Sequence, residues 1–392
     1  MRIREVRAAL VDLAPQPKTP PRVPRQPTEG FASPMQRYPE FKRADWTSHW
    51  KRCAVVVTAD DGTFGVGFTG HGGPIKEIVN GHFAPLLTGQ DCIATEKLWD
   101  VMRRASSPYG TAGLASYAIS AVDIALWDLK GKLLQRPVYE LLGGPQKQDV
   151  PCYASNTDLS YGTENSIAWF LELGFKAVKL FLREGSEAGV GGVRRTEELV
   201  ARTREQIGPD VELMLDCWLS TNVEYLVRLG EALRPYRLKW LEDYFLSEDL
   251  ESYARVRERL PGTILATGEH WYTIHPFALA ASRGLVDIFQ PDLAWCGGIS
   301  AGLRICHVAE AHGQTVITHG GMNYPWGQHL ALAMPAIVMG ERSEGVSPPG
   351  VPLEEMTVLP GTVPIRHGRV RPTDAPGLGL EITRDWLETK AA

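Results

Sequence analysis

Two hydrophobic patterns divide the chain, and the first occupies about 145 residues. Apolar and polar positions alternate from Ile3 to Leu13, which predicts a strand. Cys53 to Thr69 predicts two more strands joined by Asp61-Gly62, a strong hairpin signal. Apolar residues at spacings of three and four predict helices over Ile75 to Leu87, Cys92 to Arg104 and Leu114 to Leu134. Residues 1–145 are therefore expected to form an α+β domain with helices packed on a small antiparallel sheet.

From about residue 150 the pattern changes to short, mostly apolar, β-branched runs separated by amphipathic helical stretches. Eight such runs begin at Val150, Lys176, Val211, Leu238, Thr263, Val286, Gln314 and Ala336. Strands that alternate with helices imply a parallel sheet, and eight repeats imply closure into a (β/α)8 TIM-type barrel. We expect the barrel over residues 146–349, and we expect residues 350–392 to return to the first domain.

A proline-rich segment, residues 14–46, interrupts the first domain after its first predicted strand. Its basic residues include Arg37 and Arg43. A stretch of this composition and length disfavours regular structure, so it predicts either a disordered loop or a functional lid.

Composition excludes several classes of protein. The 392 residues are 44% hydrophobic and 22% charged, which is typical of a globular chain. A net charge of −5 gives no global attraction to nucleic acid or to an anionic membrane, and no apolar run reaches the roughly 18 residues of a membrane-spanning helix. The start lacks the features of a signal peptide, so we expect a cytoplasmic protein with neither kind of partner. The six cysteines are isolated, which predicts small core residues rather than disulfides or zinc ligands.

Three acidic residues end consecutive predicted barrel strands. Asp216 ends the third run, Glu242 the fourth and Glu269 the fifth. Reacting groups of barrel enzymes lie at the C-terminal ends of the strands, so these carboxylates are expected to converge. An all-oxygen ligand set suits Mg²⁺ better than zinc or copper. The alternative is that each acid caps the following helix or pairs with a neighbouring lysine.

Asp292 and His319 end the sixth and seventh runs, which places an acid and an imidazole on adjacent strands. A carboxylate bonded to one ring nitrogen fixes the tautomer and makes the other nitrogen a general base near neutral pH. Lys179, in the second run, points toward the same mouth in this interpretation. His270 follows the third acid and could donate a hydrogen bond to an anion, or it could be a structural loop histidine.

These residues resemble the enolase superfamily and, within it, the mandelate racemase subgroup. The stretch from Ser120 to Gly144 is similar to that subgroup's connection between an N-terminal capping domain and a modified barrel, and the acidic and histidine residues follow in the expected order. More narrowly, several short stretches are similar to the rhamnonate dehydratase family. They are MLDCWLS, LKWLED, GEH, QPDLAWCGG, the HGG that starts at His319 and the loop SPMQRYPEF. The resemblance covers nearly the whole chain.

The resemblance implies a Mg²⁺-dependent dehydratase that acts on a small sugar acid, with L-rhamnonate first and L-lyxonate or a related acid next. It assigns the three carboxylates to Mg²⁺, His319 with Asp292 to acid and base chemistry, and His270 to stabilising the intermediate. It also implies a symmetric homo-oligomer.

Many superfamily members have Lys-x-Lys on the second strand, where the second lysine is a base for the other face of the substrate. Here the sequence is Lys179-Leu180-Phe181, which favours dehydration by one histidine over racemisation by two bases. An epimerase or cycloisomerase of the same superfamily remains an alternative, as does a barrel that binds without catalysis.

Substrate contacts are expected from four further residues. Arg43 is the first candidate for the substrate carboxylate or a hydroxyl, and Arg37 is the second. His329 lies in a stretch that does not align securely with the family. Glu341 ends the eighth strand, where other members place an acid, although a surface salt bridge explains it equally well.

Overall fold

The computed structural model describes residues 1–28, 30–41, 43–343 and 346–392. Positions 29 and 42 of the predicted proline-rich segment, and positions 344 and 345 of the predicted barrel, lie outside the described residues. In the N-terminal domain, β1 (Ile3–Val11), β2 (Arg52–Ala59) and β3 (Phe64–Thr69) form an antiparallel sheet in that order. Three strands and the turn at Asp61-Gly62 therefore agree with the prediction.

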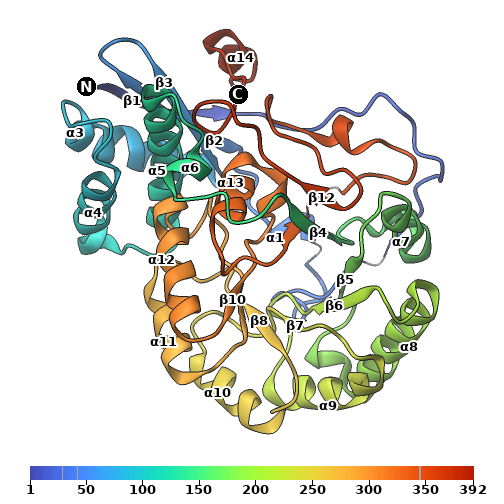
Figure 1. The fold of residues 1–392 in the computed structure, drawn as a ribbon. Coiled ribbons are helices and arrows are strands. Elements are labelled where there is room, and N and C mark those ends of the chain that lie inside the picture. The colour runs from blue at the N-terminus through green and yellow to red at the C-terminus, as the bar shows by residue number, and fades with distance from the viewer. Residues whose placement is uncertain (29, 42, 344–345) are drawn as a thin grey trace.

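Helices cover this sheet, and the longest of them, α5, packs directly on β2 and β3 (Figure 1). The helical segments of the domain are α2 (Gly72–Ile78), the π-helical η1 (Val79–Phe83), α3 (Ala84–Leu87), α4 (Thr95–Ser106), η2 (Ser107–Tyr109), α5 (Leu114–Leu134) and α6 (Val138–Leu141). The predicted helix from Ile75 to Leu87 thus contains a π-helical turn, whereas α4 and α5 match their predictions closely. Sixteen residues of α5 are buried because the helix has the sheet on one side and the barrel on the other.

Eight parallel strands form the second domain, one in each of the eight predicted runs, and the last strand extends one residue beyond its run. They are β4 (Val150–Ser155), β5 (Ala177–Phe181), β6 (Glu212–Asp216), β7 (Leu241–Glu242), β8 (Leu265–Thr267), β9 (Ile288–Phe289), β10 (Thr315–Val316) and β11 (Gly340–Arg342). Their order is β10-β9-β8-β7-β6-β5-β4-β11. A parallel bridge between Val316 and Ile337 joins β10 to the residues before β11, so the sheet closes into the predicted barrel.

Helices surround the barrel on the outside, as Figure 1 shows for α7 to α12. The helical segments are η3 (Leu159–Tyr161), α7 (Thr163–Glu172), η4 (Ser186–Ala188), α8 (Gly189–Ile207), α9 (Val223–Leu233), η5 (Arg234–Tyr236), α10 (Leu250–Arg259), α11 (His275–Arg283), α12 (Gly298–Ala311), η6 (Gly321–Asn323) and α13 (Pro325–Ala333). None of the helices described combines the length and hydropathy needed to cross a bilayer. All six cysteines are buried and free of disulfides, as predicted.

The C-terminal segment contacts both domains. Its elements are η7 (Leu353–Met356), β12 (Arg369–Val370) and α14 (Arg384–Thr389). The strand β12 pairs antiparallel with β4 of the barrel, a contact that the sequence did not predict. Further along, the Leu378 amide donates to Asp128 of α5 at 2.9 Å, and Ala391 bridges to Val11 of β1. The C-terminal segment therefore contacts α5 and β1 as well as the barrel.

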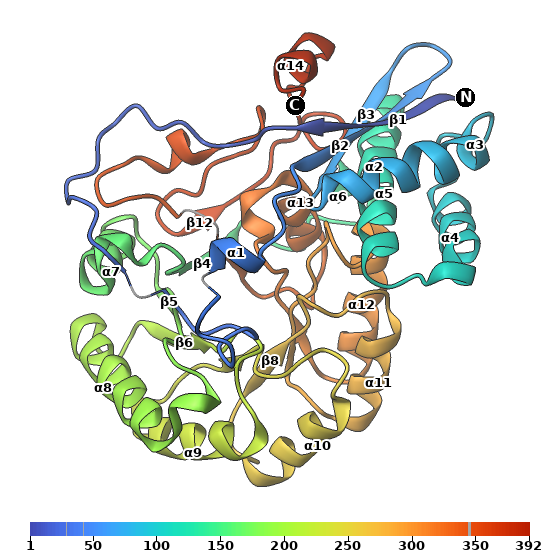
Figure 2. The same ribbon diagram turned by 180° about the vertical axis from the view of Figure 1, so that it is seen from behind.

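The proline-rich segment lies against the barrel loops, and its residues 43–46 form the short helix α1 (Arg43–Trp46) (Figure 2). The Ala32 amide donates to the Leu182 carbonyl at 2.7 Å, and the Gly185 amide donates to Gln36 at 2.6 Å. The ring of Phe31 contacts those of Phe181 and Trp218, at centroid distances of 5.1 and 5.4 Å. The segment thus covers the C-terminal ends of β5 and β6, as a lid would.

A buried carboxylate of α5 caps the barrel helix α12 and joins the two domains. Asp123 accepts hydrogen bonds from the amide and the hydroxyl of Ser300, at 2.9 and 2.6 Å. The Trp127 indole donates to the same hydroxyl at 2.9 Å, and the Gly297 amide donates to Ser120 of α5 at 2.8 Å. The first turn of a helix has amides without intrahelical partners, so α5 satisfies donors of α12 that are buried at the interface.

We predict that Asp123→Ala lowers the free energy of unfolding by about 2 kcal/mol, because it removes a cap and leaves buried donors unsatisfied. Urea unfolding followed by circular dichroism measures the change. Asp100→Ala is the matched control, since Asp100 forms ion pairs with Arg103 and Arg104 on the exposed face of α4 and should lose little stability. Equal losses in the two variants would contradict the prediction.

Candidate active site

Inside the barrel, a layer of apolar side chains, here called the floor, is followed toward the C-terminal ends of the strands by a layer of polar side chains. The floor contains one side chain from or beside each strand: Tyr153, Ala177, Met214, Trp240, Ala266, Ile288, Ile317 and Met339. Alternate residues of a strand face the same side, so positions two residues further on also face inward. Seven of these eight positions are polar: Ser155, Lys179, Asp216, Glu242, Gln290, His319 and Glu341. Strand alternation therefore gathers the predicted chemistry at one end of the barrel.

The eighth position is Gly268, and it redirects the chain after β8. Its φ of +137° lies where residues with a side chain rarely occur, and a Cβ there would approach Phe277 to 2.8 Å and the Gln290 amide to 3.0 Å. The next residue, Glu269, therefore enters the polar layer from a bent segment instead of a regular strand.

The structure brings together the three carboxylates that the sequence proposed as metal ligands. Asp216, Glu242 and Glu269 each offer an oxygen within 4.8 Å of the others, and all three are buried. Burial raises the pKa of Asp216 to about 6, that of Glu269 to about 7 and that of Glu242 to about 8. A set of buried oxygen ligands with excess negative charge fits Mg²⁺, so the donor set could hold that ion.

Lys179 lies among these carboxylates. Its Nζ is 3.1 Å from Asp216 and 2.8 Å from Glu341, and it also contacts Glu242. Burial alone would lower the pKa of Lys179, but Glu242 and Glu341 raise it well above its usual value. The ammonium thus stays charged and balances part of the negative charge.

Asp292 and His319 are in contact, as the adjacent strand ends predict. The His319 Nδ1 is 2.9 Å from Asp292 and the Nε2 is 3.2 Å from Glu269, so one nitrogen faces the dyad partner and the other faces the carboxylate trio. Burial opposes the imidazolium, but Glu269 and Asp292 raise the pKa of His319 well above its usual value. This imidazole is therefore placed to exchange a proton through Nε2.

His270 has a partner that the sequence analysis missed. Its Nδ1 is 3.1 Å from Asp243 and 3.3 Å from Glu269. Asp243 is almost fully buried, has a positive φ of 45° and also accepts a hydrogen bond from Thr267 at 3.0 Å. Burial lowers the pKa of His270, but Asp243 and Glu269 outweigh it and raise the pKa to about 9. The sequence did contain an indication of this partner, because Asp243 directly follows Glu242 at a predicted strand end.

Glu341 also belongs to this layer, and the surface salt bridge considered for it is wrong. The residue is 1% exposed, contacts Lys179 and accepts hydrogen bonds from Ser155 at 2.5 Å and from the Gly320 amide at 2.8 Å. Burial raises the pKa of Glu341, but Lys179 outweighs it and lowers the pKa to about 2. Glu341 is thus an ionised group within hydrogen-bonding distance of the residue after His319.

The other three expected substrate contacts lie in different surroundings. The Arg43 guanidinium stacks on Phe31 and Trp218, and the Trp218 amide donates to Asp216 at 2.9 Å. Arg37 pairs at the surface with Glu187, at 3.4 Å. His329 is fully buried, and its Nδ1 accepts from the Tyr139 amide of α6 at 3.1 Å. Of these three residues, only Arg43 is connected to the three carboxylates, because Trp218 contacts both Arg43 and Asp216.

A phenyl ring occupies the position where other members of the superfamily have a second base. Phe181 is 8% exposed and packs against Phe31 of the proline-rich segment. Because a phenyl group cannot exchange a proton, the β5 side of the mouth offers no base at this position.

A cavity of about 290 Å³ opens beside the dyad, between the two domains. Asp292 and His319 line it together with residues of the N-terminal domain that the sequence analysis did not single out, among them Arg52 and His71. Arg52 donates to the hydroxyl of Tyr324, which also lines the cavity. A volume of this size is at the lower end of the range for small-molecule sites.

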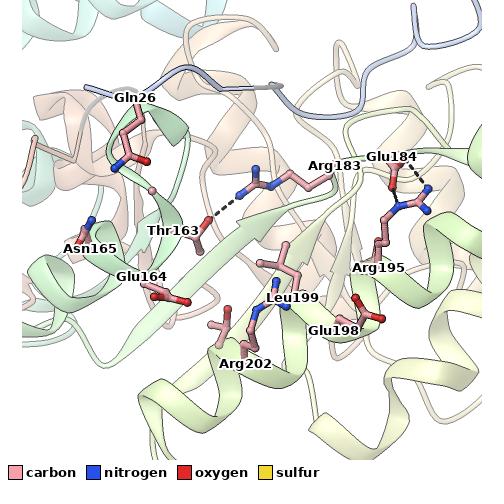
Figure 3. Close-up of a pocket in the computed structure, with 13 residues that line it drawn as sticks. Gln26, Thr163, Glu164, Asn165, Arg183, Glu184, Arg195, Glu198, Leu199 and Arg202 are labelled. Atoms are coloured by element: carbon pink, nitrogen blue, oxygen red, sulfur yellow. Dashed lines mark hydrogen bonds and ion pairs between the residues drawn. The ribbon is translucent and has the colours of Figure 1, made fainter. Parts of the chain in front are cut away.

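A larger cavity, of about 600 Å³, lies between α7 and α8 (Figure 3). Two of its arginines contact acidic or hydroxyl groups of the same wall, since Arg195 pairs with Glu184 at 2.5 Å and Arg183 donates to Thr163 at 2.6 Å. None of the three carboxylates and neither dyad residue lines it. Size alone therefore does not identify the reactive site.

Comparisons with known proteins agree with this geometry. Residues 164–386 match the family described as enolase C-terminal domain-like, and residues 32–143 match the N-terminal domain of mandelate racemase and muconate lactonizing enzyme. The chain belongs to this family. The resemblance noted from sequence motifs is thus confirmed, and the chain is an enzyme of the enolase superfamily.

Relatives within the superfamily include dehydratases and a cycloisomerase. L-rhamnonate dehydratase of Saccharopolyspora erythraea is 39% identical over 359 residues, which is 90% of this chain and 89% of that protein. The crystal structure of rhamnonate dehydratase from Gibberella zeae complexed with Mg matches with a TM-score of 0.85 at 28% identity, covering 100% of this chain and 96% of that one. The 3,6-anhydro-D-galactonate cycloisomerase of Zobellia galactanivorans matches with a TM-score of 0.79 at 26% identity over 100% of both chains.

We predict that Asp216→Asn weakens Mg²⁺ binding by about 100-fold or more, because it removes a charged ligand from the trio. Isothermal titration calorimetry with MgCl₂ measures the affinity. Glu212→Gln is the matched control, since Glu212 lies at the other end of β6 and pairs with Lys239. Unchanged Mg²⁺ affinity in Asp216→Asn would show that the trio is not the metal site.

Proposed function

We propose that this enzyme is a Mg²⁺-dependent sugar acid dehydratase whose substrate is L-rhamnonate or a close relative. The observation that carries the proposal is the position of one imidazole. His319 has Nδ1 on Asp292 and Nε2 facing the carboxylate trio, while Phe181 occupies the position of a second base. The 39% identity to an L-rhamnonate dehydratase over most of both chains supports the substrate class.

Asp216, Glu242 and Glu269 would hold the Mg²⁺. When bound, the ion supplies positive charge beside the substrate carboxylate, which favours loss of the neighbouring C2 proton. Lys179 and His270 add fixed positive charge at the same end of the barrel, because neighbouring carboxylates raise the pKa of each.

His319 is the proposed acid and base. Asp292 accepts a hydrogen bond from the N–H at Nδ1 of the imidazole, which leaves Nε2 to take the C2 proton. The same Nε2 then donates this proton to the C3 hydroxyl, which leaves as water. The electron pair of the C2–H bond forms the C2–C3 double bond as the C3–O bond breaks, and the enol becomes a 2-keto-3-deoxy acid. One histidine therefore serves both steps from one face of the substrate.

We predict that His319→Asn lowers turnover by about 10²- to 10⁴-fold, the usual contribution of a positioned base. A continuous assay for the 2-keto product measures the rate, and calorimetry should show that Mg²⁺ still binds. His312→Asn, on the exposed end of α12, is the control and should keep its activity. Full turnover by His319→Asn would contradict the assignment of the base.

Dehydration and epimerisation are separated by the products that they form in D₂O. We predict a product with a CHD or CH₂ group beside a ketone in the proton NMR spectrum, because the C3 hydroxyl leaves. Starting material that exchanges deuterium at C2 without forming a ketone would instead indicate an epimerase, and a cyclised product would indicate a cycloisomerase.

A further inference from the structure

One hydroxyl in the wall of the interdomain cavity lacks the hydrogen bond that its burial requires. Ser343 follows β11, is 3% exposed, and its Oγ has no hydrogen-bond partner among the described residues. Buried hydroxyls in folded proteins nearly always have a partner, either a protein group or an ordered water, so an unsatisfied one beside a cavity is open to a hydrogen bond with water or with a ligand. Other polar groups of the same wall are bonded to protein, for example His71 to Ser48 at 3.1 Å.

Asn323 fixes the backbone of Ser343 from both sides. Its Oδ1 accepts from the Ser343 amide at 3.0 Å, and its Nδ2 donates to the Ser343 carbonyl at 2.7 Å. Asn323 belongs to η6, which follows His319 by two residues. These two hydrogen bonds therefore fix the position of Ser343 relative to the strand end that carries the proposed base, His319.

A glycine keeps the space beside the Ser343 hydroxyl open. Gly320 directly follows His319, has a φ of +55°, and a Cβ there would lie 3.0 Å from the Ser343 Oγ. Ser343, Gly320 and His319 all line the same cavity. The Ser343 Oγ thus lies beside the residue that follows His319, and position 320 has no side chain to occupy the space next to it.

The direction of the cavity suggests which part of a substrate this hydroxyl meets. The His319 Nε2 faces the carboxylate trio, whereas the cavity runs from the dyad toward the N-terminal domain. A sugar acid with its carboxylate at the trio and C2 and C3 at His319 would extend its remaining carbons into this cavity. This step rests on the proposed function.

We propose that Ser343 is a specificity-determining residue whose Oγ forms a hydrogen bond with a substrate hydroxyl on a carbon beyond C3. A hydroxyl is both donor and acceptor, so it pairs with a sugar hydroxyl in either direction. Sites built to bond a substrate hydroxyl discriminate strongly against analogues that lack it, because the protein group is then left buried and unpaired.

The test compares Ser343→Ala with Ser347→Ala on L-rhamnonate and on its 4-deoxy and 5-deoxy analogues. Ser347 is the matched control, since it is also buried but its Oγ accepts from Trp169 at 2.9 Å, outside the cavity. We expect Ser343→Ala to lower kcat/KM for L-rhamnonate by about ten-fold or more. For the analogue that lacks the bonded hydroxyl, the same substitution should change kcat/KM by less than about two-fold.

The proposal would be overturned if Ser343→Ala lowered kcat/KM equally for L-rhamnonate and both deoxy analogues, or if it did not lower kcat/KM for L-rhamnonate. Calorimetry separates this failure from failure of the proposed function. In Mg²⁺-loaded His319→Asn, addition of Ser343→Ala should weaken L-rhamnonate binding by about ten-fold, whether or not the wild-type protein dehydrates that acid. Absent turnover with this loss of binding would contradict only the dehydratase assignment, and turnover with unchanged binding would contradict only the role of Ser343.

Discussion

Neutralisation of buried negative charge is the constraint on which this site depends. Six buried carboxylates share one end of the barrel: Asp216, Glu242, Asp243, Glu269, Asp292 and Glu341. Several carboxylates this close and this buried cannot all remain ionised without positive partners. Lys179 contacts three of them, and His270 and His319 between them contact the other three. Each of these carboxylates therefore has a cationic partner. A bound divalent ion would add positive charge to a site whose negative charge the protein already neutralises in part.

The placement of these groups follows from the alternation of residues along a strand. The apolar floor of the barrel fixes which positions face inward, and the polar layer lies two residues further on in each strand. This regularity made it predictable that Asp216, Glu242 and His319 lie at one end of the barrel, because a strand end can be located from a run of apolar residues. The closure of the barrel, the presence of α4 and the limits of α5 were predictable for a similar reason, since a long periodic pattern stays recognisable despite single exceptions.

Features that depend on contacts between distant segments were not predictable. Asp243 was visible beside Glu242, but only its positive φ turns its side chain toward His270. Arg52 lies on a strand of the first domain, and no local pattern indicated that it lines a cavity with His319. The π-helical turn within the first predicted helix keeps the same apolar spacing, so periodicity alone could not reveal it. Arg37 has the positive charge expected of a group that binds a substrate carboxylate, but it forms an ion pair with Glu187 at the surface.

In the proposed function, the barrel supplies the chemical groups and the N-terminal domain contributes to the cavity that receives the substrate. The side chains proposed to bind the metal and move the proton all come from barrel strand ends. The cavity beside them is walled partly by the N-terminal domain, including Ser48, Arg52 and His71. Its shape therefore depends on how that domain docks, and the cap from Asp123 to α12 fixes part of the docking surface. Substitutions in the capping domain can alter which acid fits without displacing the imidazole, because the base and its partner belong to the barrel alone.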